Sequence, residues 1–226
     1  MRRQPFLPVL LTVFALLGAA GPAALGQSIA DSSPPTFTEA GGEFEFVRLA
    51  YSSNGRMSMW GSRQMWQTDW PDAEFHFLDG VRRLTGIAAA AEGRVMRPLD
   101  ESIFDYPWVY AVEVGYWSLD DAEAAHLREY LLRGGFLVVD DFHGSLEWMS
   151  FLASLQKIFP DRNVVDIPEA DEVFHVMYDL DHRIQIPSRM FIYSGVTWEK
   201  DGYTPHWRGV YDDDGRLMVA INFNMD

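Results

Sequence analysis

The sequence predicts one α/β domain, a three-layer sandwich with a parallel β-sheet between helices, followed by a C-terminal β-hairpin. Three observations predict this class. Expected strands and amphipathic helices alternate from Phe44 to Phe159, as they do when helices connect parallel strands. The strand at Phe136–Asp140 is apolar on both sides, which is typical of strands covered on both faces. Asp214-Gly215 between two apolar runs indicates a hairpin turn.

Local patterns predict the elements of the first half. Phe44–Ala50 alternates apolar and polar residues and predicts the first strand. A loop rich in Gly, Met and Trp follows from Ser52 to Trp70, and loops of this length inside compact domains are usually functional or mobile. Pro71–Gly86 has the start, apolar spacing and stop of a helix. Ile103–Asp105 predicts a short strand and Trp108–Glu113 a longer one.

The second half continues the same alternation. Ser118 with Asp121 suggests a capping box at the start of a helix, and Gly134 ends that helix in a left-handed conformation. The buried strand at Phe136–Asp140 is followed by a helix over Ser145–Phe159. The remaining expected elements are a strand at Val164–Val165, a helix at Asp171–Tyr178, a strand at Phe191–Tyr193, and hairpin strands at Trp207–Tyr211 and Leu217–Phe223.

The N-terminus has the features of a secretory signal. Arg2 and Arg3 precede the apolar run Phe6–Leu17, and small residues flank Leu25 at an expected cleavage site. The run is shorter than the roughly 20 residues that span a bilayer. We therefore expect a signal peptide at residues 1–26, a flexible leader at 27–42 and a single domain at 43–226. The expected location is exported, periplasmic or secreted, with no stable membrane span after cleavage.

Composition limits the chemistry. The net charge is −15 and becomes −17 when the two arginines of the signal are removed, so the surface repels phosphate backbones and nucleic acid is excluded as an expected partner. The 226 residues contain no cysteine, which removes thiol nucleophiles, thiolate metal ligands and disulfides. With 48% hydrophobic residues, the apolar core must stabilise the domain unaided.

Acidic residues and a histidine follow the two central strands. Asp140, Asp141 and His143 come after the buried strand, and Glu113 ends the strand before it. Ligands of open α/β sheets bind outside the carboxyl ends of the strands. In an extended chain Asp141 and His143 share a side, so they are the predicted functional pair. Glu113 is expected at the same edge of the sheet as Asp140, and two carboxylates that converge there would raise the pKa of one and provide an acid–base pair.

Each of these residues also has a structural interpretation. Asp140 or Asp141 can cap the following helix, with His143 filling space beside it. Glu113 can simply be solvated at the strand end.

The loop before the first helix carries further candidates for ligand binding. Arg56, Trp60, Trp66 and Asp69 place aromatic faces between charged groups, a combination that suits a sugar or another polar ring. Tyr116, just after Glu113, belongs to the same predicted site. The alternative is that the tryptophans anchor the loop to the core and that Asp69 caps the helix.

Three motifs resemble a bacterial family called domain of unknown function 4159, over roughly Phe44 to the end. They are Trp66–Pro71, Ile103–Pro107 and Gly134–Gly144. The resemblance implies the class I glutamine amidotransferase-like fold, a flavodoxin-like sandwich. That fold commonly places a nucleophilic cysteine on the turn matching Asp140–His143, and its absence here rules out thiol-dependent glutaminase chemistry. The family also continues past the final strand, so the chain is open to interpretation as a fragment ending at Asp226.

Three functional hypotheses follow. The first is an exported domain that binds a small polar ligand, carbohydrate-like or derived from the cell envelope, at the edge holding Glu113 and Asp140–His143. The second is a non-thiol hydrolase using Asp141, His143 and Glu113, with a divalent cation as a possible cofactor; no other cofactor is evident. The third is a structural partner domain of an envelope complex. Neither enzymatic activity nor oligomeric state follows from the sequence.

Overall fold

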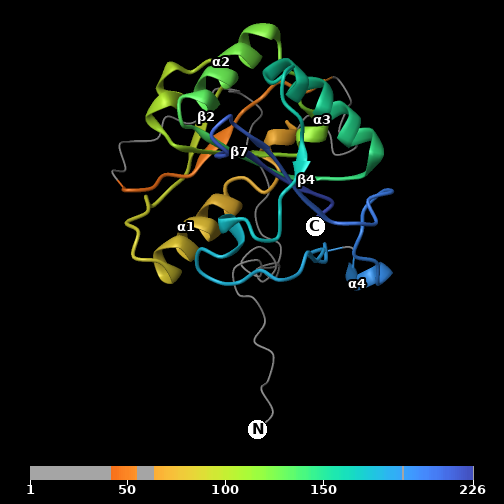
Figure 1. Cartoon of the computed structure of the whole chain (residues 1–226). Coiled ribbons are helices and arrows are strands. Elements are labelled where there is room, and N and C mark those ends of the chain that lie inside the picture. The colour runs from red at the N-terminus through yellow and green to blue at the C-terminus, as the bar shows by residue number, and fades with distance from the viewer. Residues whose placement is uncertain (1–41, 55–63, 190, 226) are drawn as a thin grey trace, which may run out of the picture.

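A computed structural model describes residues 42–54, 64–189 and 191–225 (Figure 1). One seven-stranded sheet runs through the described chain in the order β2-β1-β3-β4-β7-β6-β5. The first five strands in this order run parallel, β6 pairs antiparallel with β7, and β5 pairs antiparallel with β6. In spatial order the strands are β2 (Arg94–Met96), β1 (Val47–Leu49), β3 (Trp108–Val112), β4 (Phe136–Phe142), β7 (Leu217–Phe223), β6 (His206–Tyr211) and β5 (Val165–Asp166).

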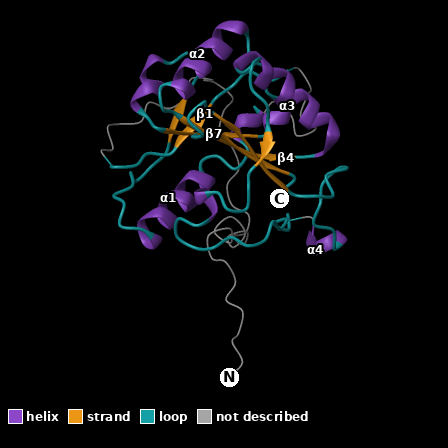
Figure 2. Ribbon diagram, in the orientation of Figure 1, coloured by secondary structure: helices purple, strands orange, loops and turns teal. Residues whose placement is uncertain are grey.

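Helices cover both faces of the sheet. Helices α2 (Asp121–Leu132) and α3 (Gly144–Ile158) lie together on one face, and α1 (Asp72–Leu84) lies on the other (Figure 2). Short helical turns complete the described chain: η1 (Met65–Gln67), η2 (Glu101–Asp105), η3 (Val114–Tyr116), η4 (Glu172–Phe174) and α4 (Phe191–Ser194). The α/β class and the parallel arrangement of the central strands are therefore confirmed, and β6 and β7 form the predicted hairpin.

Strand β3 shows why the sheet is covered twice. Val109 and Ala111 belong to the main core under α2 and α3, whereas Tyr110 and Val112 pack in a second cluster with Leu78 of α1. Because side chains alternate along a strand, a strand that is apolar at every position needs a helix on each side. This pattern produces the layers.

The strand order reverses direction at the centre of the sheet. From β1 the chain crosses to β2 on one side, and β3 then pairs with β1 on the other side. Such a reversal opens a crevice at the carboxyl ends of the two strands, where open α/β sheets bind ligands. The switch point here lies between β1 and β3.

A buried arginine fixes α1 and the preceding loop to the sheet. Arg48 of β1 is 0% exposed and forms an ion pair with Glu74 of α1, which is 3% exposed. Its Nη1 also donates to the carbonyls of Trp66 and Thr68, each at 3.0 Å. The guanidinium lies 5.2 Å from the ring centroid of Tyr110. A buried charge of this kind costs several kcal/mol when its partner is removed.

Several expected elements differ in the structure. Ile103–Asp105 lies in the 3-10 turn η2, because Ile103 N–H bonds to Asp100 and Tyr106 N–H bonds to Ile103, each within one turn. Phe191–Tyr193 is helical in α4 and not a strand; local hydrogen bonds shape it, and Gly195 ends it at φ +68°. The expected helix at 171–178 is reduced to η4.

Helix boundaries also shifted. The cap of α2 is Asp120, not Ser118: its side chain accepts from Glu123 N–H while the Glu123 side chain accepts from Asp120 N–H. An aspartate followed three residues later by a glutamate forms the same reciprocal box two residues downstream. Helix α1 ends at Leu84 before Gly86. Gly134 has the predicted positive φ, at +114°.

Strand β2 was not expected from the sequence, because it is only three residues long and carries a charged residue. Within the described ranges, every helix falls short of the length and apolarity that a bilayer crossing requires. The predicted signal and leader lie outside the described residues, apart from Gly42.

Candidate functional site at the carboxyl edge of the sheet

The carboxyl ends of three neighbouring strands meet at one edge. Tyr51 follows β1, Glu113 follows β3, and Asp141 lies near the end of β4. The buried Tyr51 hydroxyl lies 2.7 Å from the Val112 carbonyl oxygen and 2.8 Å from that of Glu113. This contact ties the ends of β1 and β3 together, so the backbone at the switch point is held firmly.

Glu113 is an acid of this edge with a strongly raised pKa. It has left the strand and adopts φ +54°, while its N–H still bonds to the Asp140 carbonyl at 3.0 Å. Burial, reinforced by the nearby charges of Asp141 and Glu147, raises the pKa of Glu113 to about 9. The charges of Lys200 and His143 offset part of this rise. Glu113 is therefore a neutral carboxylic acid at pH 7, able to donate and to accept a hydrogen bond.

Asp141 and His143 come together as the sequence predicted, but for a different reason. Asp141 Oδ1 lies 3.9 Å from His143 Nδ1. The chain is not extended there: Asp141 has φ +52°, and the pairing of β4 with β7 shifts between Val139 and Phe142. A bulge of this kind re-aims a side chain at the end of a strand. The bulge, rather than simple alternation, brings the two residues together.

The amide groups at the start of α3 are already occupied. His143 N–H donates to Glu147 Oε2 at 2.7 Å, Gly144 N–H to Asn224 Oδ1 at 2.9 Å, and Ser145 N–H to Asp201 Oδ1 at 2.8 Å. The Ser145 hydroxyl also bonds to Asp201, which lowers the pKa of that carboxyl. Other side chains, not Asp140 or Asp141, accept from these three amides, so the capping interpretation of the two aspartates is not supported there.

Glu147 is a buried carboxylate behind the site. It is 3% exposed, accepts from His143 N–H, and forms an ion pair with Lys200. Gly115 allows this approach, because a Cβ at that position would lie 2.4 Å from Glu147 Cβ. The Lys200 ammonium also lies 5.9 Å from the ring centroid of Tyr116. Lys200 is thus the cation that Glu147 and the neighbouring acids share.

Asp140 belongs to a different environment. The Tyr110 hydroxyl donates to its Oδ2 at 3.4 Å, and Tyr110 lies in the cluster beneath α1. Burial raises the pKa of Asp140, while hydrogen bonds from the Asp141 backbone and the Asn222 side chain lower it. The structure therefore separates the Asp140 carboxyl from Asp141 and links it to the layer containing Arg48. The carboxylate whose charge acts on Glu113 is Asp141, not the expected Asp140.

The ligand-binding candidates of the loop before α1 differ in where the structure places them. Arg56 and Trp60 lie outside the described residues. Trp66 packs against the main core and its ring centroid lies 6.4 Å from that of Trp70. Asp69 is exposed, and α1 has Pro71 at its cap position without a side-chain bond, so the capping role expected of Asp69 is wrong. Trp66 therefore matches the anchoring interpretation.

Strained backbone is concentrated around this edge. Five described non-glycine residues have positive φ, and four of them, Glu113, Asp141, Lys200 and Asn224, form the site or its immediate support. Asn224 accepts from Gly144 N–H, and Lys200 pairs with Glu147. Such conformations cost about 1–3 kcal/mol each and persist where surrounding structure over-determines them, commonly at ligand sites.

Sequence reasoning missed Glu147, Lys200, Asp201 and Asn224. A signal existed only for Glu147, which lies four residues after His143 on an expected helix and therefore on the same side. The other three come from segments distant in sequence: Lys200 is 53 positions from Glu147, and Asn224 is 80 from Gly144.

The acidic and histidine side chains of the described residues are not grouped as metal ligands. Among the described residues, no three His, Asp or Glu side chains are arranged to hold a metal ion. The Glu147 carboxylate is instead paired with Lys200, and that of Asp141 lies 3.9 Å from His143 Nδ1.

The fold and this edge define a class of protein: a mixed α/β domain with a mostly parallel sheet and an acidic cluster at the carboxyl ends of its central strands. The chain belongs to the family described as Domain of unknown function (DUF4159), which matches residues 45–226. This agrees with the resemblance drawn from the three motifs. No curated protein matches the sequence.

Proposed function

We propose that the carboxyl edge binds a small polar ligand rich in hydroxyl groups, carbohydrate-like or derived from the cell envelope. The observation that carries this proposal is the environment of Glu113, whose pKa of about 9 keeps it neutral beside Asp141 and Glu147. A neutral acid donates and accepts, carboxylates accept, and the Lys200 ammonium donates. A ligand hydroxyl, which both donates and accepts, is complementary to that mixture.

The position of the site supports the same proposal. Glu113 ends β3, beside the switch point between β1 and β3. The five parallel strands lie in the order β2-β1-β3-β4-β7. Flavodoxin-like sheets have the corresponding order 2-1-3-4-5. We accordingly propose a class I glutamine amidotransferase-like architecture, modified by the antiparallel strands β6 and β5.

Thermal unfolding in the presence of glucose, N-acetylglucosamine and glycerol tests the binding proposal. A ligand at 100 times its Kd stabilises the folded state by about 2.7 kcal/mol, so even weak binders raise the Tm. We expect at least one sugar to raise the Tm of the wild type and to fail with Asp141→Asn. The matched control is Glu169→Gln, at an exposed acid that is not among the charges acting on Glu113. No shift with any probe, or equal shifts with Asp141→Asn, would refute the proposal.

A second candidate function is hydrolysis without a thiol. The observation that favours it is a pair of neighbouring acids in different protonation states. Glu113 is held neutral, and the charge of Asp141 contributes to raising the pKa of Glu113. Such pairs act as general acid and as base or nucleophile. His143, 3.9 Å from Asp141, would orient or share the proton. A divalent cation belongs to this candidate as an optional cofactor.

Nitrophenyl glycosides and nitrophenyl esters are suitable substrates for the test, each with Mg²⁺ or with EDTA. If Glu113 is the general acid, the rate falls as pH rises through about 9 and Glu113→Gln removes that limb of the profile. Activity that is unchanged in Glu113→Gln would assign the chemistry to other residues, and loss with EDTA alone would assign it to a metal.

We also propose that the chain is exported, from its signal-like first 26 residues. Fractionation of cells expressing the full chain tests this. Recovery of uncleaved protein in the cytoplasm would contradict it. The remaining alternative, a structural partner domain in an envelope complex, predicts co-purification of an envelope protein that survives Asp141→Asn.

A further inference from the structure

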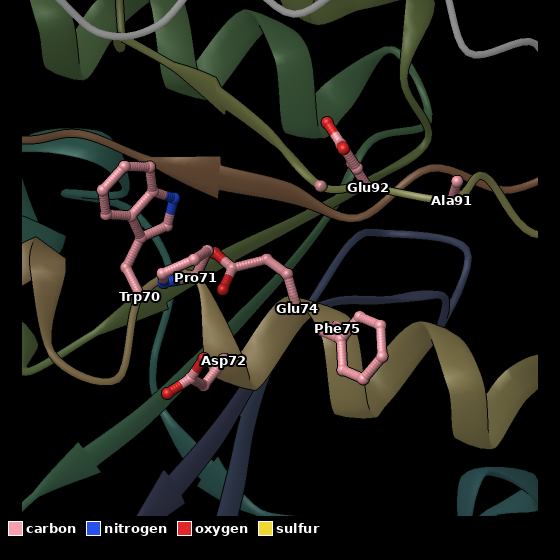
Figure 3. A pocket seen from close by; sticks show the side chains of 8 residues that line it. Trp70, Pro71, Asp72, Glu74, Phe75, Ala91 and Glu92 are labelled. Carbon is pink, nitrogen blue, oxygen red and sulfur yellow. The ribbon is translucent and has the colours of Figure 1, made fainter. Parts of the chain in front are cut away.

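A cavity lies between α1 and the segment that leads into β2, and it contains none of the residues of the carboxyl-edge site. The cavity has a volume of about 420 Å³, within the range of small-molecule sites. Figure 3 shows the residues around it. They come from the start of α1 and from the turn before β2: Trp70, Pro71, Asp72, Glu74, Phe75, Ala91, Glu92 and Gly93.

The side chains that line the cavity are aromatic or acidic, apart from small residues and Pro71. Two aromatic rings, Trp70 and Phe75, stand among three carboxylates, and the lining contains no basic side chain. Phe75 is 58% exposed although it lies on a well-ordered helix face. Covering such a ring removes apolar surface from water, at roughly 25 cal/mol per Å². The cavity therefore offers apolar contact and negative charge together.

The charges of the lining are only partly compensated. Glu74 is paired with Arg48. Asp72 and Glu92 form no ion pair within 4.0 Å among the described residues. The start of α1 stabilises Asp72 through the helix dipole, but Glu92 precedes β2 and has no such support. A net charge of −15 on the whole chain further favours cations over anions near this surface.

Glu74 provides an independent observation. Its carboxylate is almost fully buried, and its Oε2 has no hydrogen-bond partner among the described residues. In Figure 3 the side chain extends from α1 toward Pro71, in the space between α1 and the segment carrying Ala91 and Glu92. Gly93 faces this side chain so closely that a Cβ would lie 2.5 Å from Glu74 Cγ. A buried acceptor without a donor costs about 1–3 kcal/mol. Arg48 Nη2, on the guanidinium that pairs with Glu74, is likewise buried without a partner among the described residues.

We propose that this cavity is a second binding site, for a small organic cation with an apolar body, such as an arylalkyl ammonium ion. The apolar body packs against Trp70 and Phe75, whose ring faces attract cations. The ammonium group donates to the exposed Glu92 carboxylate. The alternative to a binding site is that Asp72 and Glu92 are solvated and that Phe75 is an isolated exposed ring.

Calorimetric titration of the full chain with benzylammonium chloride tests the proposal, and NMR of the tryptophan indole N–H signals locates the site. Benzyl alcohol is the neutral analogue of matched shape, and benzoate is the anionic one. We expect one-to-one binding of benzylammonium, about tenfold weaker binding of benzyl alcohol and none of benzoate. Raising the salt concentration should weaken benzylammonium binding.

Two variants complete the test. Glu92→Gln replaces an exposed carboxylate and should lower the affinity about fivefold, and Trp70→Leu should lower it similarly. Glu169→Gln and Asp141→Asn are expected to bind as the wild type does, which separates this cavity from the carboxyl edge. Equal affinities for benzylammonium and benzyl alcohol, an unchanged Glu92→Gln, or no saturation by about 20 mM ligand would overturn the proposal. Because Glu92 is exposed, that variant does not depend on a core residue.

Discussion

Replacing Glu113 by glutamine should change how stability depends on pH. The carboxyl has a raised pKa of about 9 in the folded protein, against 4.5 for the free side chain. Between these values the unfolded chain is ionised while the folded chain retains the proton. Unfolding therefore releases one proton, and the free energy of unfolding falls by about 1.36 kcal/mol for each unit that pH rises. The contribution is fully favourable below about pH 4.5 and lost by about pH 9.

Glutamine keeps the shape and the neutral charge but cannot ionise. The difference in unfolding free energy, Glu113→Gln minus wild type, should therefore grow with pH. Over three units, from pH 5 to pH 8, the increase is about 4 kcal/mol as an upper value, because a partly exposed site is screened by solvent. At pH 5 the difference should be small, since both proteins then carry a neutral group in the folded state.

Urea unfolding at half-unit steps of pH, followed by circular dichroism, measures this difference through the midpoint and slope. The exposed-acid variant Glu169→Gln is the matched control and should show a flat difference. A flat difference for Glu113→Gln as well would mean that Glu113 titrates normally, and the neutral acid at the centre of the proposed site would be abandoned.

Two further predictions concern the scaffold. Arg48→Met leaves the buried Glu74 carboxylate without its partner and should lower the free energy of unfolding by about 3–5 kcal/mol; the double variant with Glu74→Gln should recover part of this loss, and no recovery would contradict the pairing. Gly144→Ala places a Cβ against Asp201 at φ +76° and should cost more than about 2 kcal/mol. The comparison is Gly134→Ala, which has positive φ but open space and should cost only the backbone strain of about 1–2 kcal/mol; equal losses by urea unfolding would refute the steric argument.

The sequence predicted the elements whose burial follows a local period. The strand at β3, the buried strand β4 and the hairpin of β6 and β7 all lie where alternation or apolar runs placed them. The elements that failed are short and set by contacts rather than pattern. Strand β2 forms because it pairs with β1. The apolar side chains of Phe191–Tyr193 are exposed on a single helical turn.

The candidate site was predicted in part for the same reason. Glu113, Asp141 and His143 are brought to one edge because strands that run in parallel end at the same side of the sheet. Their protonation could not be predicted, since the pKa of Glu113 depends on burial and on Asp141, Glu147 and Lys200 together. Asp140 was expected opposite Asp141 but at the same edge as Glu113, whereas its carboxyl accepts from Tyr110 and the charge that acts on Glu113 is that of Asp141.

The sequence by itself therefore determined the α/β class, the edge at which acids collect, and the absence of thiol chemistry from the 226 residues. Only the tertiary structure decided how those acids behave. A bulge in β4 places Asp141 beside His143. The fold also brings Lys200 to Glu147 across 53 positions of sequence and Asn224 to Gly144 across 80. The physical reason is range: hydrophobic period and turn chemistry act between neighbours in sequence, whereas desolvation and charge act between neighbours in space.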